Sequence, residues 1–249
     1  MAVLSRPDGE IHYQVHGQGF PVLLFAPGGL RSNREFWPAP PGGPPRPWVD
    51  WTTALPAVGF AAVAMDQRNT GASKAAIEAD HGWHTYAADH MALMDHLGFE
   101  RFHVLGGCIG GSYCLRAAAT APDRVAGMVL QNPIGRHPEK RDFFERMHAD
   151  WTAEQLAARA DVTAEALAGF GRNMWDHEFV FCVDRDFVRQ CRTPAILLPG
   201  TDDPHPAATS AELAALLPDV EVLTDWRGPA HLAEQERRVV RFLKAHTPT

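Results

Sequence analysis

Seven short apolar runs, separated by segments with helical spacing, constrain this chain more than any other feature. The runs have strand length and carry β-branched residues. They cover residues 11–17, 21–27, 60–66, 102–107, 125–131, 194–200 and 220–226. The clearest helical segments cover 85–98, 111–122, 207–218 and 231–246. Strands that alternate with helices favour an α/β fold, with a mostly parallel central sheet and helices on both of its faces.

The length fits this interpretation. A chain of 249 residues is long enough for one large α/β domain or two modest domains, and 45% hydrophobic residues are enough to fill a sizeable core. No repeat of 20 to 50 residues is visible, which excludes solenoids and propellers. We therefore expect one main core.

Charge and patterning exclude several partners. The net charge of −7 leaves no basic footprint for nucleic acid. No apolar stretch approaches the ~20 residues that a membrane span needs, and the first ten residues lack the pattern of a secretory signal. The four cysteines form neither a CxxC pair nor a dense framework, so free thiols are expected. We expect a cytoplasmic protein with no membrane partner, and the oligomeric state stays open, with a homodimer as one option.

One segment interrupts the alternation of strands and helices. Residues 134–190 contain several helical patterns without a clear buried strand. We expect this segment to be a helical cap, inserted into a core formed by residues 1–133 and 191–249. Its aromatic residues either line an apolar substrate pocket or fill a core of the cap, and the second role is the commoner one for aromatics at helical spacing. They are Phe143, Phe144, Phe170, Trp175, Phe179 and Phe181.

The most informative short motif is the run of residues 106–111, Gly-Gly-Cys-Ile-Gly-Gly, where an expected strand ends and an expected helix begins. A side chain on such a turn stands at the carboxyl edge of the sheet, and glycines two residues to either side relieve crowding. Unpaired N–H groups at the helix start favour a thiolate and a developing oxyanion. Cys108 is therefore a candidate nucleophile, although a free cysteine is more often a small buried hydrophobe.

Partners for this thiol follow later in the chain. Asp202 and Asp203 come directly after the apolar run at 194–200, and His231 precedes the last helical segment. A nucleophilic thiol needs a base, and the base needs a carboxylate to orient it. His205 is a rival base, but it lies so close to the acid in sequence that the chain would have to fold back across Pro204. We expect His231 to be the base.

These motifs together resemble the α/β-hydrolase superfamily over nearly the whole chain. In that superfamily the nucleophile lies in a G-x-Nu-x-G elbow, the acid in a G-x-x-D turn and the histidine before the final helix. The residues that match in order are Gly106, Cys108, Gly110, Gly200, Asp203 and His231. The resemblance implies a Cys108–His231–Asp203 triad, with Asp202 as the alternative acid.

Two further turns match the same superfamily. Residues 26–29, Ala-Pro-Gly-Gly, resemble the turn that forms half of the oxyanion hole, and this implies donors at Gly28 and Gly29 beside the N–H of Ile109. Residues 66–73 resemble the D-x-R-G-x-G-x-S turn, with Asn69 in place of a glycine. Asn tolerates the left-handed conformation, so we interpret this turn as structural.

A cysteine where the superfamily usually has serine resembles dienelactone hydrolases and some thioesterases. The resemblance implies a hydrolase of carboxylic esters, lactones or thioesters that forms an acyl-enzyme with a small-molecule acyl substrate and needs neither cofactor nor metal. An acyltransferase with the same triad and a catalytically weak binding protein are the alternatives. His81 and His84 lack further ligands for a metal site. Arg31 and Arg34 are candidates for binding a substrate carboxylate, although a solvated surface position is the commoner role for such residues.

Overall fold

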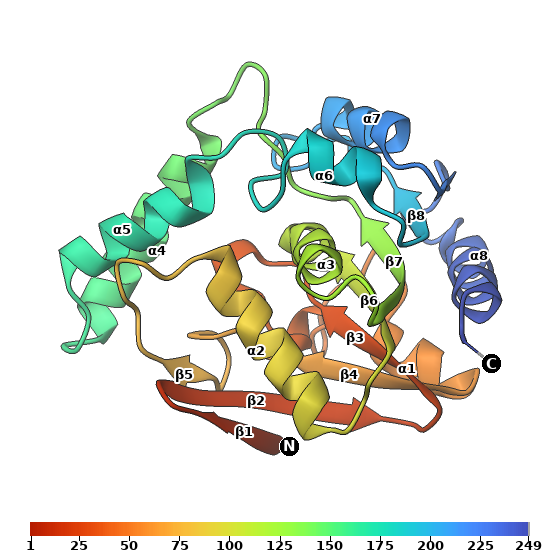
Figure 1. The fold of residues 1–249 in the computed structure, drawn as a ribbon, viewed down its shortest axis with the longest axis horizontal. Coiled ribbons are helices and arrows are strands. Elements are labelled where there is room, and N and C mark those ends of the chain that lie inside the picture. The colour runs from red at the N-terminus through yellow and green to blue at the C-terminus, as the bar shows by residue number, and fades with distance from the viewer. Residues whose placement is uncertain (249) are drawn as a thin grey trace.

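A nine-stranded sheet forms the centre of the computed structural model, which describes residues 1–248 (Figure 1). The strand order is β1-β2-β4-β3-β6-β7-β8-β9, and β5 pairs with β2. The strands are β1 Ala2–Arg6, β2 Gly9–His16, β3 Phe20–Phe25, β4 Phe60–Met65, β5 Lys74–Ala75, β6 Phe102–Gly107, β7 Val125–Gln131, β8 Ala195–Leu198 and β9 Val220–Val222. All pairs from β4 to β9 are parallel, and the pairs that involve β2 are antiparallel. The mostly parallel sheet expected from the sequence is confirmed.

Helices cover both faces of the sheet, as predicted. They are α1 Trp51–Ala57, α2 Trp83–His96, α3 Ile109–Thr120, α4 Phe143–Ala158, α5 Ala164–Trp175, α6 Arg185–Gln190, α7 Ala207–Leu216 and α8 Leu232–Ala245, with short 3₁₀ turns at Gly29–Arg31 and Arg34–Phe36. The side chains of α1 and α8 pack in one core, and those of α2, α3 and α7 pack in the core on the opposite face. Strands β4, β6, β7 and β8 are buried along their whole length, which explains their unbroken apolar sequences.

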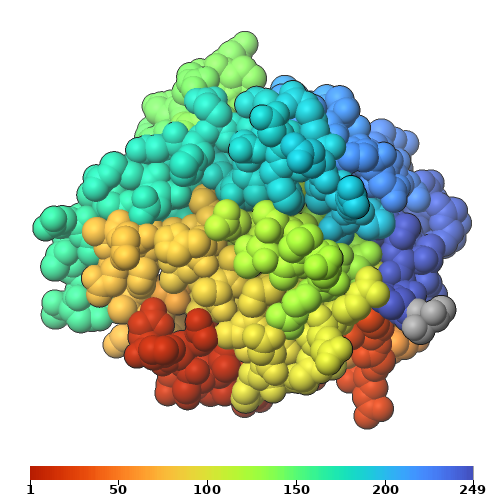
Figure 2. Space-filling view, viewed as in Figure 1, coloured from red at the N-terminus to blue at the C-terminus, as the bar shows by residue number. Residues whose placement is uncertain are grey.

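The 134–190 segment connects β7 to β8 and, in the described structure, contains helices α4, α5 and α6 but no strand. In the space-filling view its atoms, green to cyan, lie along the upper edge of the molecule (Figure 2). Its aromatic residues do not form a separate core. Phe144 stacks on Trp175 with ring centroids 5.0 Å apart, and Trp83 of α2 lies 6.1 Å from Trp175. The segment therefore shares the core of the α2 and α3 face.

Short elements were the hardest to predict from sequence. The apolar run at 220–226 is a strand only over Val220–Val222, and β1, β5 and α1 were not predicted. Residues 37–48 contain neither helix nor strand, because their many prolines lack a backbone donor and are poorly tolerated inside either element. Among the described helices, none combines the length and the apolar character that crossing a membrane requires.

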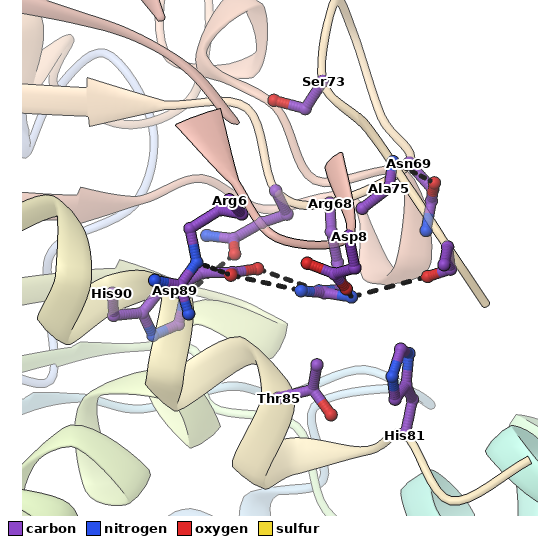
Figure 3. A network of polar contacts seen from close by, with 12 residues as sticks. Arg6, Asp8, Arg68, Asn69, Ser73, Ala75, His81, Thr85, Asp89 and His90 are labelled. Atoms are coloured by element: carbon purple, nitrogen blue, oxygen red, sulfur yellow. Dashed lines mark hydrogen bonds and ion pairs between the residues drawn. The ribbon is translucent and has the colours of Figure 1, made fainter. Parts of the chain in front are cut away.

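A buried ion-pair network fastens α2 to the antiparallel edge of the sheet (Figure 3). The Arg68 guanidinium donates to both carboxylate oxygens of Asp89, at 2.8 and 3.1 Å, and to Asp8 at 3.1 Å. Arg6 also donates to Asp89, at 3.1 Å. The side chains of Arg68 and Asp89 are only 3% and 1% exposed. Arg68 thus has a structural role, which agrees with the interpretation of the 66–73 turn.

Candidate active site

Cys108 lies between the last residue of β6 and the first residue of α3. Its backbone has φ 58° and ψ −121°, a left-handed region that side chains other than glycine rarely adopt. Its N–H donates to the carbonyl of Gln131 at 3.0 Å, which links the turn to the end of β7. The turn thus holds the thiol at the carboxyl edge of the sheet, where it is partly exposed.

The glycines around Cys108 are required by contacts with the backbone. A Cβ atom on Gly106 would overlap the carbonyl of Gly110, and a Cβ on Gly110 would overlap the carbonyl of Phe25 at the end of β3. The sharp strand-to-helix turn is possible only if both positions lack a side chain. The G-x-Cys-x-G pattern is therefore explained by close packing of α3 against β3 and β6.

The imidazole that faces this thiol belongs to His205. His205 lies in the turn that follows β8, and 9% of the residue is exposed. Its Nδ1 hydrogen-bonds to Oδ1 of Asp202. Its Nε2 is buried and has no nitrogen or oxygen atom as a hydrogen-bond partner among residues 1–248. Nε2 is therefore the ring nitrogen that remains for the sulfur, and the side chains of Cys108 and His205 shift each other's pKa.

Asp202 and His205 are held together by their own backbone. The N–H of His205 donates to the carbonyl of Asp202 at 3.0 Å and also reaches Oδ1 of Asp202 at 3.2 Å. The side chain of Asp202 is 43% exposed, whereas that of His205 is 11% exposed. The acid thus lies on the solvent side of the imidazole, and the thiol lies on the inner side.

The electrostatics favour a charged pair between sulfur and imidazole. Burial alone would raise the pKa of the Cys108 thiol, but the hydrogen bond and charge of His205 outweigh burial and lower that pKa below its usual value. Burial alone would lower the pKa of His205, but Cys108 and then Asp202 outweigh it and raise that pKa. Both shifts have the direction expected when a thiolate lies beside an imidazolium.

Two backbone N–H groups also act on the sulfur. Hydrogen bonding by the backbone of Gly28 and of Ile109 contributes to the lowered pKa of Cys108. Ile109 opens α3, and Gly28 lies in the turn after β3, with φ 125°. The expected oxyanion donors Gly28 and Ile109 thus lie at the thiol. Gly29 instead begins the first 3₁₀ turn, where its carbonyl accepts the N–H of Ser32 at 3.1 Å.

The structure corrects the expected position of the base. His231 caps the start of α8, its N–H donates to the carbonyl of Gly228 at 2.9 Å, and its side chain makes no hydrogen bond within the described residues. The group that acts on the pKa of Cys108 is the imidazole of His205. The loop before α8 approaches the site with Arg227 instead of with a histidine.

The structure also corrects the expected acid. The carboxylate of Asp203 pairs with Lys140 and lies 4.0 Å from Nε2 of His137, so it points toward the 134–190 segment. The neighbouring Asp202 carries the carboxylate that contacts His205. Successive residues in an extended or turned backbone point in different directions, and the G-x-x-D spacing selected Asp203, the residue whose side chain points away from His205.

A signal for the contact between Asp202 and His205 was present in the sequence. Asp202 and His205 are three residues apart between Gly200 and Pro206, in a segment rich in turn-forming residues. A turn of four residues brings its first and last members together, so closeness in sequence favoured this pair. The fold-back across Pro204 that counted against His205 is the turn itself.

The two arginines near the oxyanion turn are already paired. Arg31 makes two hydrogen bonds to the carboxylate of Glu154, at 3.1 and 2.6 Å, and Arg34 pairs with the buried Asp66 at 2.5 Å. Both guanidinium groups already pair with carboxylates of the protein itself. Met147 of α4 packs against Gly29. A Cβ atom placed on that glycine would lie only 3.2 Å from the Met147 sulfur.

Two surface cavities lie near this region, and Cys108 lines neither of them. The larger, about 840 Å³, lies between α2, α3 and residues 177–189. The smaller, about 330 Å³, is lined by Asp202, Asp203 and His137 together with the start of α7. No cluster of metal-ligating side chains is found in the part of the chain that the structure describes.

A mostly parallel sheet with helices on both faces, and a sharp strand-to-helix turn at its carboxyl edge, defines the α/β-hydrolase class of fold. The family model described as the alpha/beta hydrolase fold matches residues 21–181, which is more than half of the chain. The chain belongs to this family, and hydrolase chemistry is supported.

Individual known proteins are similar to most of the chain. A putative carbamate hydrolase, RutD, from Azorhizobium caulinodans is 26% identical over 91% of this chain and 90% of its own length. An N-formylmaleamate deformylase from Pseudomonas putida is 24% identical over 76% of this chain and 71% of its own. The solved enol-lactonase from Burkholderia xenovorans LB400 has a TM-score of 0.64 at 18% identity, and the match covers 98% of this chain and 100% of that one.

Proposed function

We propose that the chain is a cysteine-dependent acyl hydrolase that acts on carboxylic esters, lactones or thioesters through a covalent acyl-enzyme. The observation that carries the proposal is the position of Cys108. It lies on a left-handed turn, beside a buried imidazole and two N–H groups that lower the pKa of its thiol. Cys108 is the nucleophile, His205 the base and Asp202 the residue that orients the base.

In the first half of the reaction the Cys108 thiolate attacks the substrate carbonyl carbon, and the oxygen becomes an oxyanion held by the N–H groups of Gly28 and Ile109. The tetrahedral intermediate collapses, the bond to the leaving group breaks, and the His205 imidazolium gives that group its proton. In the second half, water loses a proton to His205 and attacks the thioester. The carboxylic acid leaves, and the thiolate and imidazolium are restored.

The names of the relatives widen the set of substrates to be tested. One relative is named a carbamate hydrolase and another a deformylase that acts on an N-formyl amide. In carbamates and formamides, as in esters, a nucleophile attacks the carbonyl carbon and the bond to the leaving group then breaks. A substrate panel for this chain should therefore contain carbamates and N-formyl amides beside esters, lactones and thioesters.

We also propose that residues 134–190 act as a cap over the site. Two contacts support this role: Met147 of α4 lies next to Gly29, and Glu154 of α4 pairs with Arg31 in the turn that follows β3. A cap in this position would exclude water from the acyl-enzyme until the leaving group has departed.

A set of three variants tests the triad. Cys108→Ala and His205→Gln should each lower turnover at least about a thousandfold, because they remove the nucleophile and its base. His231→Gln is the matched control and should retain the rate of the unaltered protein, since its imidazole does not reach the thiol. Turnover of the best panel substrate is the measurement.

The reverse pattern, with His231→Gln inactive and His205→Gln active, would show that the loop before α8 supplies the base. Mass spectrometry should detect an acyl adduct on Cys108 after rapid acid quenching. Competing alcohols or amines in the assay separate hydrolysis from acyl transfer, because a transferase would give the corresponding ester or amide. Ligand-induced melting shifts without any turnover would indicate a binding protein instead.

A further inference from the structure

The carboxylate of Asp202 has a second partner, which comes from the other side of the site. Oδ1 of Asp202 accepts from His205, and Oδ2 accepts from Nη1 of Arg227 at 3.3 Å. Arg227 lies between β9 and α8, in the loop from which the sequence led us to expect the base. The two oxygens of one carboxylate are thus divided between an imidazole and a guanidinium.

The backbone around Arg227 is fixed on both sides. The buried Trp226 donates from Nε1 to the carbonyl of Pro199 at 2.9 Å, directly before the turn that carries Asp202. The N–H of Gly228 donates to the carbonyl of Pro47 at 2.8 Å. These anchors hold Arg227 next to the turn before its side chain makes any contact, which lowers the entropy lost in the contact with Asp202.

We infer that Arg227 is a positioning residue, which acts on catalysis by holding the Asp202 carboxylate so that Oδ1 remains on Nδ1 of His205. This inference rests on the proposed function, in which Asp202 orients the imidazole. A half-exposed carboxylate with one partner rotates easily about its terminal torsion. A second partner on the other oxygen restricts that rotation, and the imidazole then keeps Nε2 toward the sulfur.

Asp203 provides an internal comparison. It belongs to the same turn, and it also pairs with a cation, Lys140. The side chains of Lys140 and Arg227 are similarly exposed, at 48% and 43%. Removal of either cation changes the local charge by the same amount. Only Arg227 is bonded to the carboxylate that contacts His205, so only its loss should disturb the orientation of the imidazole.

The test is a double-mutant cycle on Arg227 and Asp202, with Lys140→Gln as the matched control. Arg227→Gln should lower kcat/KM for p-nitrophenyl acetate about fivefold, the effect expected from an exposed ion pair. Most of that loss should fall in kcat. In an Asp202→Asn background, which is itself slower, the same substitution should cause no further loss, since the group through which it acts has gone.

A second readout reports the thiol directly and requires no substrate. The rate of Cys108 alkylation by iodoacetamide is measured as a function of pH. In Arg227→Gln this pH profile should shift toward higher pH, because a disordered Asp202 carboxylate stabilises the imidazolium less. Arg227→Lys should restore part of the shift, since it returns the charge but not the guanidinium geometry. Lys140→Gln should leave the profile where it is.

Equal losses for Arg227→Gln in the unaltered protein and in the Asp202→Asn background would overturn the inference, as would an alkylation profile that moves equally in Lys140→Gln. Failure of the proposed function has a different signature. If Asp202→Asn and Cys108→Ala both retain turnover, the triad itself is wrong. If those two variants are impaired and Arg227→Gln is not, only the role of Arg227 is refuted.

Discussion

Cys108 combines a strained backbone with a stabilised charge. A residue other than glycine in the left-handed region costs roughly 1–2 kcal/mol, and packing of Gly106 and Gly110 against neighbouring backbone leaves the turn no relaxed alternative. The same strain places the sulfur in front of the Ile109 N–H and the His205 imidazole. We interpret the strain as the cost of presenting the thiol to a carbonyl carbon.

The lowered pKa of Cys108 makes a prediction about pH. A thiol with an ordinary pKa of about 8.5 is only about 1% thiolate at pH 6.5. Because His205 lowers the pKa of Cys108, iodoacetamide should alkylate this residue at pH 6.5 faster than that fraction allows. Alkylation followed by peptide mass spectrometry measures this rate.

His205→Gln provides the control for this prediction. Without the imidazole, burial is the dominant influence and raises the pKa of the thiol, so alkylation should require alkaline pH. The three other cysteines are buried, and burial raises the pKa of Cys114 and Cys182. Fast alkylation at either of those two positions in the folded protein would contradict the assignment of Cys108 as the activated thiol.

At the scale of elements, the Arg68 network decides how α2 is attached. Arg68 follows β4, Asp8 lies between β1 and β2, and Asp89 lies in α2 (Figure 3). At the C-terminal end of α2, the ring of His96 forms a hydrogen bond with the hydroxyl of Tyr13 in β2, at 3.1 Å. The buried charges of the network therefore fix the middle of a helix that packs in the core behind the candidate site.

Substitution of Asp89 tests this attachment. Asp89→Asn leaves the buried guanidinium of Arg68 with only the partly exposed Asp8 as a charged partner, so the free energy of unfolding should fall by about 3 kcal/mol. Chemical denaturation measures the loss. Asp186→Asn, which breaks an exposed pair with Arg189, is the control and should change stability by less than about 1 kcal/mol. A similar change in both variants would show that burial of the network contributes nothing.

The proposed cap is the element whose role depends most on its neighbours. Helices α4 and α5 share the core of the α2 and α3 face, and the aromatic contact between Phe144 and Trp175 belongs to that core. A segment packed in this way is expected to unfold with the domain and not before it. Its hydrogen-exchange protection would then resemble that of α3.

At the scale of the whole molecule, buried histidines link stability to pH. Burial, as the largest cause, lowers the pKa of His90 to about 3 and that of His103 to about 4. In the unfolded chain both have pKa values near 6.5. Below pH 6.5 the unfolded state therefore binds protons that the folded state does not, and acid favours unfolding.

The contribution of these two histidines to the free energy of unfolding should be constant above about pH 7 and should fall by about 2 kcal/mol per histidine between pH 6.5 and 4.5. Denaturation at several pH values measures the slope. His103→Phe should reduce the slope by removing one of the two groups, since aromatic rings of Phe20 and Phe60 already surround this position. His84→Gln, at an exposed position, should leave the slope unchanged.

The sequence predicted the layers of the molecule and the turn that carries Cys108, but not which imidazole and which carboxylate lie beside this thiol. Long apolar strands such as β6 and β7 are visible because both of their faces are buried, whereas β5 has only two residues and no pattern to detect. Cys108 was found because its constraint is local, in the glycines on either side. His231 was the expected base because the superfamily places its histidine before the final helix. Whether His231 or His205 lies near the thiol depends on a tertiary contact between segments that are far apart in the sequence.

The turn from Asp202 to His205 carries the proposed acid and the proposed base within four residues. Their mutual alignment is consequently a property of local backbone geometry, and only one tertiary relation, that between this turn and the Cys108 elbow, has to be achieved by folding. The superfamily pattern places the nucleophile, the acid and the base on three separate loops. Here the corresponding side chains lie on two, the Cys108 elbow and the turn from Asp202 to His205. Such a unit is short enough to be grafted as a single peptide beside an elbow in another scaffold.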